Sequence, residues 1–236
     1  MMKIKKKKVD FVLSCGAACR PARYTQVLRM RLFSSPCDWM MSYSLNDFIA
    51  VLDTQATSMF KDARLDTVKK WVVDDRNGMI SMHDFDCNQD LSIQLPSFYE
   101  KMQRRAKNTV ERIEKSSSVG IIMNRMLTSD ELITFAEALS QRYPKVIFSI
   151  VNIKDNPHIK VAELTYSCNK ESYNIYEVSF DDAHIDGRSQ DDNPNFWLGN
   201  EEMWKNVLNK CFSVKWSKLR VFKSKIKGIL SKIVKK

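Results

Sequence analysis

The sequence has little that would build a phosphate loop, a metal centre or a membrane span. Only six glycines occur in 236 residues, without a GxGxxG or P-loop pattern, which excludes the common glycine-rich phosphate loops. Six cysteines occur without a CxxC pair, which argues against a zinc ribbon or a disulfide scaffold. No apolar run approaches the roughly 18 residues of a transmembrane helix, and the start is too short for a secretory signal. We therefore expect no cofactor, no metal and a reducing cytoplasm.

Acidic residues are missing from both ends of the chain. Residues 1–8 hold five lysines, and residues 213–236 hold nine lysines or arginines, without an Asp or Glu in either segment. Removing these fourteen from the 38 basic residues leaves 24 against 28 acidic ones, so the body carries a charge near −4 although the chain carries +10. The basicity lies in two tails, which suits an anionic surface, and we expect no specific nucleic acid.

The C-terminal tail has apolar residues at helical spacing among its lysines. This pattern is typical of a basic amphipathic helix that lies on anionic lipid. A helix packed on the domain and a disordered tail are the alternatives. We expect residues 214–236 to contact an anionic membrane, at its inner face.

Residues 9–212 predict a single α/β domain. Strand-like segments alternate with amphipathic helices, as in a mostly parallel sheet flanked by helices in three layers. The expected strands are residues 9–13, 68–73, 79–82, 119–123, 145–153 and 173–180, and the expected helices are 21–31, 42–52, 97–115, 128–143 and 201–211. Residues 159–167 fit either a strand or a short helix. Ser44 and Ser129 are the expected N-caps of the second and fourth helices, and Asn77-Gly78 predicts a hairpin.

Residues 11–39 combine a buried strand, a turn of small residues and the start of a helix. The strand at 11–13 leads into a turn at 14–19, and Pro21 suits the first helical position. A helix N-terminus beside Cys19 would lower the pKa of its thiol and favour a nucleophile. A cysteine in such a turn is more often a small buried apolar residue, so both interpretations stay open.

Three histidines could supply the base that a cysteine nucleophile needs. His83 follows a strand-like segment and precedes Asp84, and either Asp84 or Asp38 could orient its imidazole. His158 and His184 lie in polar loops without an evident partner.

Acidic residues give only weak metal-site patterns. The acids and cysteine at 84–87 could form a metal site with His83, but no second cluster supplies ligands at a recognised spacing. The acidic pairs at 181–182 and 191–192 could hold a cation, although such pairs are usually solvated.

Four motifs follow one another along the chain. They are FVLSCGAACRPA at 11–22, RLFSSPCDW at 31–39, SMHDF at 81–85, and WLG at 197–199 with Trp204. Over about residues 9–210 they resemble a bacterial family named for papain-like cysteine peptidase activity, a domain of unknown function often encoded near surface-polysaccharide genes. Cys15 and Cys37 stand where that family tends to have Leu and Phe. By position, the resemblance implies Cys19 as the nucleophile and His83 as its base.

The first functional hypothesis is a cytoplasmic Cys–His hydrolase acting on a peptide or acyl substrate. Cys19 attacks a carbonyl, His83 moves the proton, and Asp38 or Asp84 orients His83. Backbone N–H groups of residues 17–19 hold the oxyanion. The residues assigned to substrate binding are Ser14, Gly16, Trp39, Arg125 and Trp197.

Two further hypotheses use the same domain differently. In one, the crevice beyond the strand ends binds a sugar or nucleotide-sugar of a surface-polysaccharide pathway, and Cys19 is structural. In the other, the chain is a membrane-surface module whose basic tail makes the contact.

Overall fold

The computed structural model describes residues 4–191 and 193–215. The membrane-binding helix expected over residues 214–236 therefore lies almost entirely outside the described residues. In the part that is described, no helix combines the length and the apolar character needed to cross a membrane.

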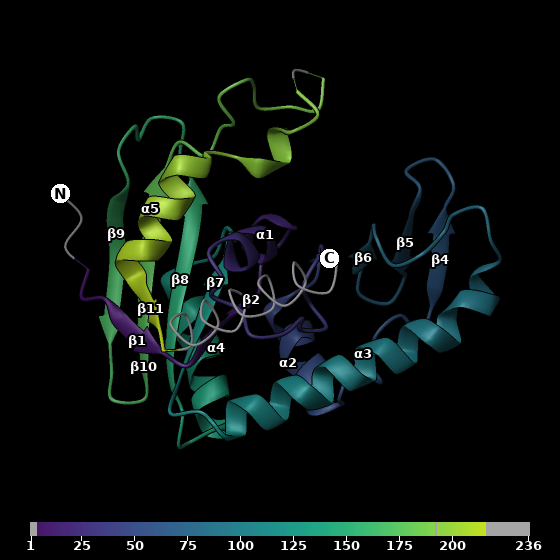
Figure 1. The fold of residues 1–236 in the computed structure, drawn as a ribbon, viewed down its shortest axis with the longest axis horizontal. Helices are drawn as coiled ribbons and strands as arrows, with labels where there is room; N and C mark the ends of the chain where they lie inside the picture. The colour runs from purple at the N-terminus through teal and green to yellow at the C-terminus, as the bar shows by residue number, and fades with distance from the viewer. Residues whose placement is uncertain (1–3, 192, 216–236) are drawn as a thin grey trace, which may run out of the picture.

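The main sheet has five strands in the order β2-β7-β8-β10-β9 (Figure 1). Its strands are β2 (Phe11–Ser14), β7 (Ser118–Met123), β8 (Ile147–Asp155), β9 (Glu163–Asn169) and β10 (Tyr173–Phe180). All neighbours are parallel except β9, which pairs antiparallel with β10 at the edge. The mixed α/β content and the mostly parallel main sheet are confirmed. Because four strands run in one direction, their carboxyl ends share one edge of the sheet.

Two smaller sheets also occur among the described residues. One is antiparallel in the order β3-β6-β5-β4, with β3 (Met40–Met41), β4 (Ala63–Asp66), β5 (Trp71–Asp74) and β6 (Ile80–Ser81). Its β5–β6 pair is the predicted hairpin, and Gly78 adopts φ 74° in its turn. The other pairs β1 (Lys7–Val9) in parallel with β11 (Phe212–Val214). The single strand predicted at 9–13 is therefore two strands, divided at Asp10.

Five α-helices lie in the described residues: α1 (Arg20–Val27), α2 (Leu45–Asp53), α3 (Leu91–Glu114), α4 (Ser129–Arg142) and α5 (Glu201–Cys211). A 3₁₀ turn, η1, spans Phe196–Leu198. The capping box predicted from Ser44 is present, with the Asp47 N–H 3.0 Å from Ser44 Oγ. The N-cap of α4 is Thr128, not Ser129, and its partner in the box is Glu131.

Two predicted helix boundaries are wrong for local reasons. The helix predicted at 21–31 ends at Val27, because the Met30 N–H returns to Thr25 O at 2.8 Å and Arg29 adopts φ 55°. The helix predicted from residue 97 begins at Leu91, where the Asp90 side chain caps the Ser92 N–H at 2.8 Å. The helix continues through Pro96, which lies within its first two turns.

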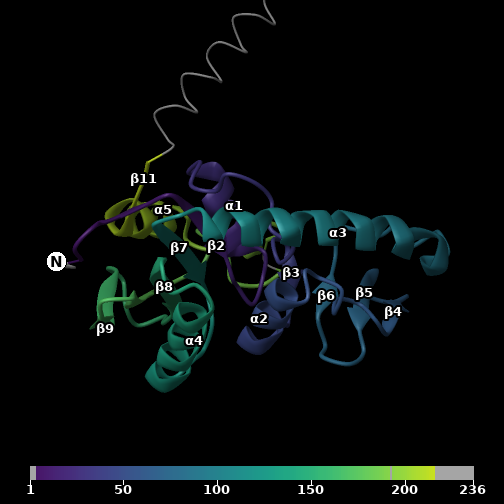
Figure 2. The same ribbon diagram turned by 90° about the horizontal axis from the view of Figure 1, so that it is seen from below.

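The apolar side chains of the main sheet divide between two buried clusters. One contains Leu13, Ile121, Ile150 and Ile175 together with residues of α2, α3 and α4. The other contains Val12, Ile122, Val151 and Val178 together with residues of α1 and α5. Figure 2 shows α5 and α1 on one side of this sheet and α4 on the other. Alternate strand residues therefore bury opposite faces, as a central parallel strand requires.

Helix α3 links the main sheet to the small antiparallel sheet, running along the molecule past both (Figure 2). Phe98 of α3 packs its ring 4.7 Å from Phe85 and 5.1 Å from Phe60. The Tyr99 hydroxyl donates to Phe60 O at 2.6 Å. This aromatic cluster anchors the segment that carries His83, two residues before Phe85.

Candidate active site

The turn after β2 is packed too closely for a side chain at its glycine. A Cβ on Gly16 would lie 2.4 Å from Pro21 Cγ and 2.7 Å from Asn124 Oδ1. Asn124 follows β7, so two parallel strands meet here at their carboxyl ends. The Gly16 assigned to substrate binding therefore has a packing role, which fixes the distance between the turn and the start of α1.

The Arg125 side chain supports the same turn through hydrogen bonds to its carbonyls. Its guanidinium donates to the carbonyls of Cys15 at 2.9 Å, Gly16 at 3.1 Å and Tyr43 at 2.6 Å. The guanidinium carbon also lies 4.5 Å from the centre of the Tyr43 ring, and Arg125 is 9% exposed. These contacts make Arg125 a support of the turn, whereas the sequence assigned it to substrate binding.

Cys19 is the N-cap residue of α1, where the sequence places it, but its thiol is buried. Sγ lies 3.8 Å from the carbonyl O of Trp39. Burial raises the pKa of the Cys19 thiol above its ordinary value, against the expectation that the helix N-terminus lowers it. Burial therefore disfavours the thiolate form of Cys19 in this conformation.

The raised pKa of the Cys19 thiol predicts how it reacts with iodoacetamide in the free protein. Only the thiolate is alkylated, so a raised pKa means slow labelling at neutral pH and a rate that still climbs above pH 9.0, the ordinary thiol pKa. Site-resolved mass spectrometry across a pH series measures this. Rapid labelling of Cys19 at mildly acidic pH would contradict it, and half-buried Cys168 serves as the internal reference.

Trp39 joins Cys19 to His83. Its backbone adopts φ 70°, an uncommon value for a bulky residue, and its ring meets the His83 ring edge-on at 6.1 Å between centroids. His83 is exposed. Among the described residues no hydrogen bond joins Cys19 to His83. The structure thus brings the predicted nucleophile and base to one residue, without direct contact between them.

The two carboxylates proposed to orient His83 are bound elsewhere. Asp38 is buried and accepts from Ser14 Oγ at 2.5 Å, Arg31 Nη1 at 2.6 Å and the Ser35 N–H at 3.1 Å. Asp38 therefore orders the loop before Trp39. The hydroxyl of Ser14, which was assigned to substrate binding from the sequence, donates to this carboxylate.

Asp84 is next to His83 in the chain, but its carboxylate accepts from Ser81 Oγ at 2.9 Å and Lys101 Nζ at 2.6 Å. Its orienting role stays a prediction.

The predicted oxyanion donors are partly used. The Ala17 N–H donates to Asn124 Oδ1 at 3.2 Å, and Ala17 O accepts from the Ser42 N–H at 3.2 Å. The Ala18 N–H has no acceptor within residues 4–191 and 193–215. The Ala18 N–H is therefore a donor of this turn that stays available for an oxyanion beside Cys19.

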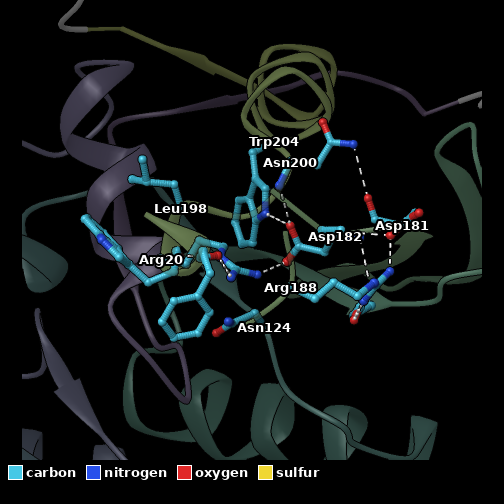
Figure 3. A network of polar contacts seen from close by, with 12 residues as sticks. Arg20, Asn124, Asp181, Asp182, Arg188, Leu198, Asn200 and Trp204 are labelled. Carbon is cyan, nitrogen blue, oxygen red and sulfur yellow. Dashed lines mark hydrogen bonds and ion pairs between the residues drawn. The ribbon is translucent and has the colours of Figure 1, made fainter. Parts of the chain in front are cut away.

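Next to Cys19, at the start of α1, Arg20 belongs to an ion pair that sequence reasoning missed (Figure 3). Arg20 pairs with Asp182, which also accepts from Trp204 Nε1 at 2.7 Å and from the Asn200 N–H at 3.1 Å. Burial raises the pKa of the Asp182 carboxyl, and the Arg20 guanidinium acts in the opposite direction. The acidic pair read as solvated therefore contains a buried member. Its position directly after β10, at the carboxyl edge of the sheet, was the available signal.

The same network holds the segment that carries Trp197. Arg20 donates to the carbonyls of Trp197 at 2.8 Å and Phe196 at 3.2 Å, and the Tyr24 hydroxyl donates to Leu198 O at 2.8 Å. The Trp197 side chain is 37% exposed. Its backbone is therefore fixed to α1 while its ring stays accessible to a substrate, as the sequence assignment requires.

This network leaves no room for a side chain at position 199. We therefore expect replacement of Gly199 to lower the stability of the fold. The φ of Gly199 is 63°, and an added Cβ would lie 2.3 Å from Asp182 Oδ1 and 2.7 Å from Arg20 Cζ. Gly199→Ala is expected to lower the free energy of unfolding by about 3 kcal/mol, through backbone strain and a displaced ion pair. Urea denaturation measures it.

Gly78→Ala is the matched control for Gly199→Ala. Gly78 also has a positive φ of 74°, but the nearest atom to its added Cβ is 4.0 Å away. It should cost only about 1 kcal/mol, from backbone conformation alone. Equal losses for the two variants would contradict the packing argument.

No group of three His, Cys, Asp or Glu side chains that could hold a metal ion occurs in the described part of the chain. The candidate site is therefore defined by Cys19, Trp39 and His83, with the Arg20–Asp182 pair next to Cys19 at the start of α1.

No protein-family model, no curated protein and no solved structure matches this chain.

Proposed function

We propose that this chain is a Cys–His hydrolase, similar in its motifs to the papain-like cysteine peptidases, that attacks a peptide or acyl carbonyl. The observation that supports it is the position of Trp39, whose carbonyl lies 3.8 Å from Cys19 Sγ and whose ring lies 6.1 Å from the His83 ring. Cys19 follows strand β2 of the main sheet and His83 follows strand β6 of the small antiparallel sheet, yet both lie beside Trp39. Nucleophilic catalysis requires the imidazole to come within hydrogen-bond reach of the thiol, and their shared neighbour Trp39 supports that pairing once His83 turns.

The buried thiol determines the order of the chemical steps. Because the pKa of Cys19 is raised, the proton leaves Sγ as the attack occurs, and His83 accepts it as a general base. Sγ forms a bond to the carbonyl carbon, and the oxyanion faces the Ala18 N–H. The imidazolium then gives its proton to the leaving amine or alcohol, and water releases the acyl group from Cys19.

His83 must turn toward Cys19 when the substrate arrives. Its only described contact is the ring contact with Trp39, and its side chain is exposed, so rotation about its side-chain torsions costs little. Catalytic hydrogen bonds are often long in free enzymes and tighten in the complex. Trp39 and Trp197 supply the aromatic surface for the substrate.

The proposal includes a three-layer α/β domain in the cytoplasm, at the inner face of a membrane. The layers are supported by the helices that contribute to the buried clusters on both faces of the main sheet. The compartment is supported by six free cysteines, two of them half-buried.

A p-nitrophenyl ester panel with short acyl groups tests the hydrolase. Wild-type protein should release a burst of p-nitrophenol equal to its own concentration, because an acyl-Cys19 intermediate accumulates. Cys19→Ser should abolish the burst, and His83→Gln should lower its rate by roughly 10²-fold or more.

Cys168→Ser is the matched control for the ester assay, because this thiol is half-buried on the edge strand β9. It should retain the burst. Intact-protein mass spectrometry locates the acyl group. The proposal would be contradicted if the burst survived in Cys19→Ser, or if the acyl group were found on another residue.

Binding of a sugar or nucleotide-sugar is the second candidate function. One observation favours it: the Cys19 thiol is 9% exposed with a raised pKa, as a structural cysteine would be. In that case UDP-glucose should raise the melting temperature of the wild type and of Cys19→Ala equally, and neither should show an ester burst.

A further inference from the structure

A polar pocket lies at the amino-terminal edge of the main sheet, the edge opposite the candidate active site. Its volume is about 380 Å³. It is lined by the starts of β7, β8 and β10 and by residues of β1 and of the segment after β11. Figure 1 shows β1 and β11 beside the ends of β8 and β10 that form this edge.

Lysines dominate the rim of the pocket. Lys7, Lys8, Lys170 and Lys215 line it together with a single acid, Glu171. Lys215 is paired with Asp10 at 2.8 Å. Lys7, Lys8 and Lys170 form no ion pair with any carboxylate in the part of the chain that the structure describes. Three cations therefore face one pocket without a direct carboxylate partner among the described residues, and Glu171 is the one acid that lines it.

Lys7 is the cation that reaches furthest into the fold. Its Nζ donates to Asn174 Oδ1 at 2.7 Å and lies 5.8 Å from the centre of the Tyr176 ring. Burial lowers the pKa of Lys7, and the neighbouring charge of Lys5 acts in the same direction. An anion in the pocket would relieve both effects.

The floor of the pocket is polar where a central sheet is normally apolar. Asn174 and Ser149 stand side by side in the register of β10 and β8, and they are 7% and 1% exposed. Asn174 Nδ2 lies 3.4 Å from Ser149 Oγ. On the same face, the next residues along these strands are Tyr176 and Val151, which belong to a buried apolar cluster. The polar pair is confined to the pocket.

The rim already binds one anionic group of the protein itself. The Asp10 carboxylate accepts from the N–H groups of Ser117 at 2.9 Å and Ser118 at 3.1 Å, and it pairs with Lys215. Backbone N–H groups, hydroxyls and an ammonium are the donors that phosphate oxygens use. The free lysines on the other side of the pocket extend this anion-binding surface.

We propose that this pocket binds a phosphate monoester, contributed by a small phosphorylated molecule or by the headgroup of an anionic lipid. Lys7 contacts it at the base and Lys8 and Lys170 at the rim. The site is independent of the hydrolase, because it occupies the other edge of the sheet.

The full-length chain tests the site with two probes, inorganic phosphate and vesicles of phosphatidylcholine with or without phosphatidic acid. The pocket variant is Lys7→Gln with Lys170→Gln, which removes the charge but keeps a polar side chain that is shorter by one atom. The matched control is Arg104→Gln with Lys107→Gln on α3, which removes the same charge from exposed positions. Calorimetry measures phosphate affinity, melting temperature reports the linked stabilisation, and flotation measures vesicle binding.

Wild type and control should bind phosphate with the same affinity. The affinity of the pocket variant should be lower by roughly tenfold or more, because two charge-assisted contacts are lost. If phosphate alone does not bind, but phosphatidic acid vesicles retain wild type and control more than the pocket variant, the lipid is the source. Equal behaviour of all three proteins with both probes would overturn the site.

Discussion

Asp182→Ala is expected to lower the free energy of unfolding by about 3–5 kcal/mol, the usual cost of removing one partner of a buried ion pair. Asp182 is buried, and it accepts from Arg20, the Asn200 N–H and the Trp204 indole (Figure 3). Removing it leaves the Asn200 and Trp204 N–H donors without their acceptor, and it leaves the charge of Arg20 with only the carbonyls of Trp197 and Phe196. Urea denaturation of the purified variant measures the change.

The neighbouring residue provides the control for Asp182→Ala. Asp181 pairs with Lys160 and Arg188, and its side chain is 20% exposed against 4% for Asp182. Asp181→Ala should cost about 1 kcal/mol or less, because water replaces partners at the surface. If both alanine variants lost the same stability, the hub role of Asp182 would be excluded.

Arg125→Met is the second large effect, with an expected loss of about 4 kcal/mol. Methionine keeps the apolar part of the side chain but leaves the carbonyls of Cys15, Gly16 and Tyr43 without their donor. Each buried group left unsatisfied costs about 1–3 kcal/mol, and relaxation of the turn reduces the sum. Denaturation in urea again measures the loss.

A second readout separates loss of the turn from general destabilisation. Because Arg125 holds the turn that carries Cys19, Arg125→Met should speed iodoacetamide labelling of Cys19 under native conditions, relative to Cys211 in α5. Arg142→Met is the control, since Arg142 forms a surface pair with Asp53 and should lose about 1 kcal/mol at most. Unchanged Cys19 labelling in Arg125→Met would contradict the supporting role.

Local patterns predicted the elements that local interactions determine. The predicted bounds of β10 and α5 agree with the structure, and so does the Ser44–Asp47 capping box. These features depend on residues within one turn of helix or on one strand's composition. The short strands β1, β3 and β11 were missed because two or three residues carry no periodicity and their partners are distant in sequence.

The candidate site shows the same division at the level of chemistry. Sequence placed Cys19 before a helix and His83 after a strand, and both positions agree with the structure. It assigned Arg125 to substrate binding, whereas that guanidinium is occupied by backbone carbonyls. The role of Arg125 could not be predicted from local sequence, since its partners come from the turn after β2 and from the segment before α2.

The sequence by itself determined the helices, the parallel character of the main sheet, and which thiol and imidazole are candidates for catalysis. Tertiary structure alone decided that the pKa of the Cys19 thiol is raised, because desolvation depends on how completely neighbouring segments cover the thiol. It also decided that Asp182 is a buried hub and not a solvated acid, and that lysines from three segments remote in sequence, at 7–8, 170 and 215, line one pocket. Burial and charge clustering arise from packing between distant segments, which no local pattern encodes.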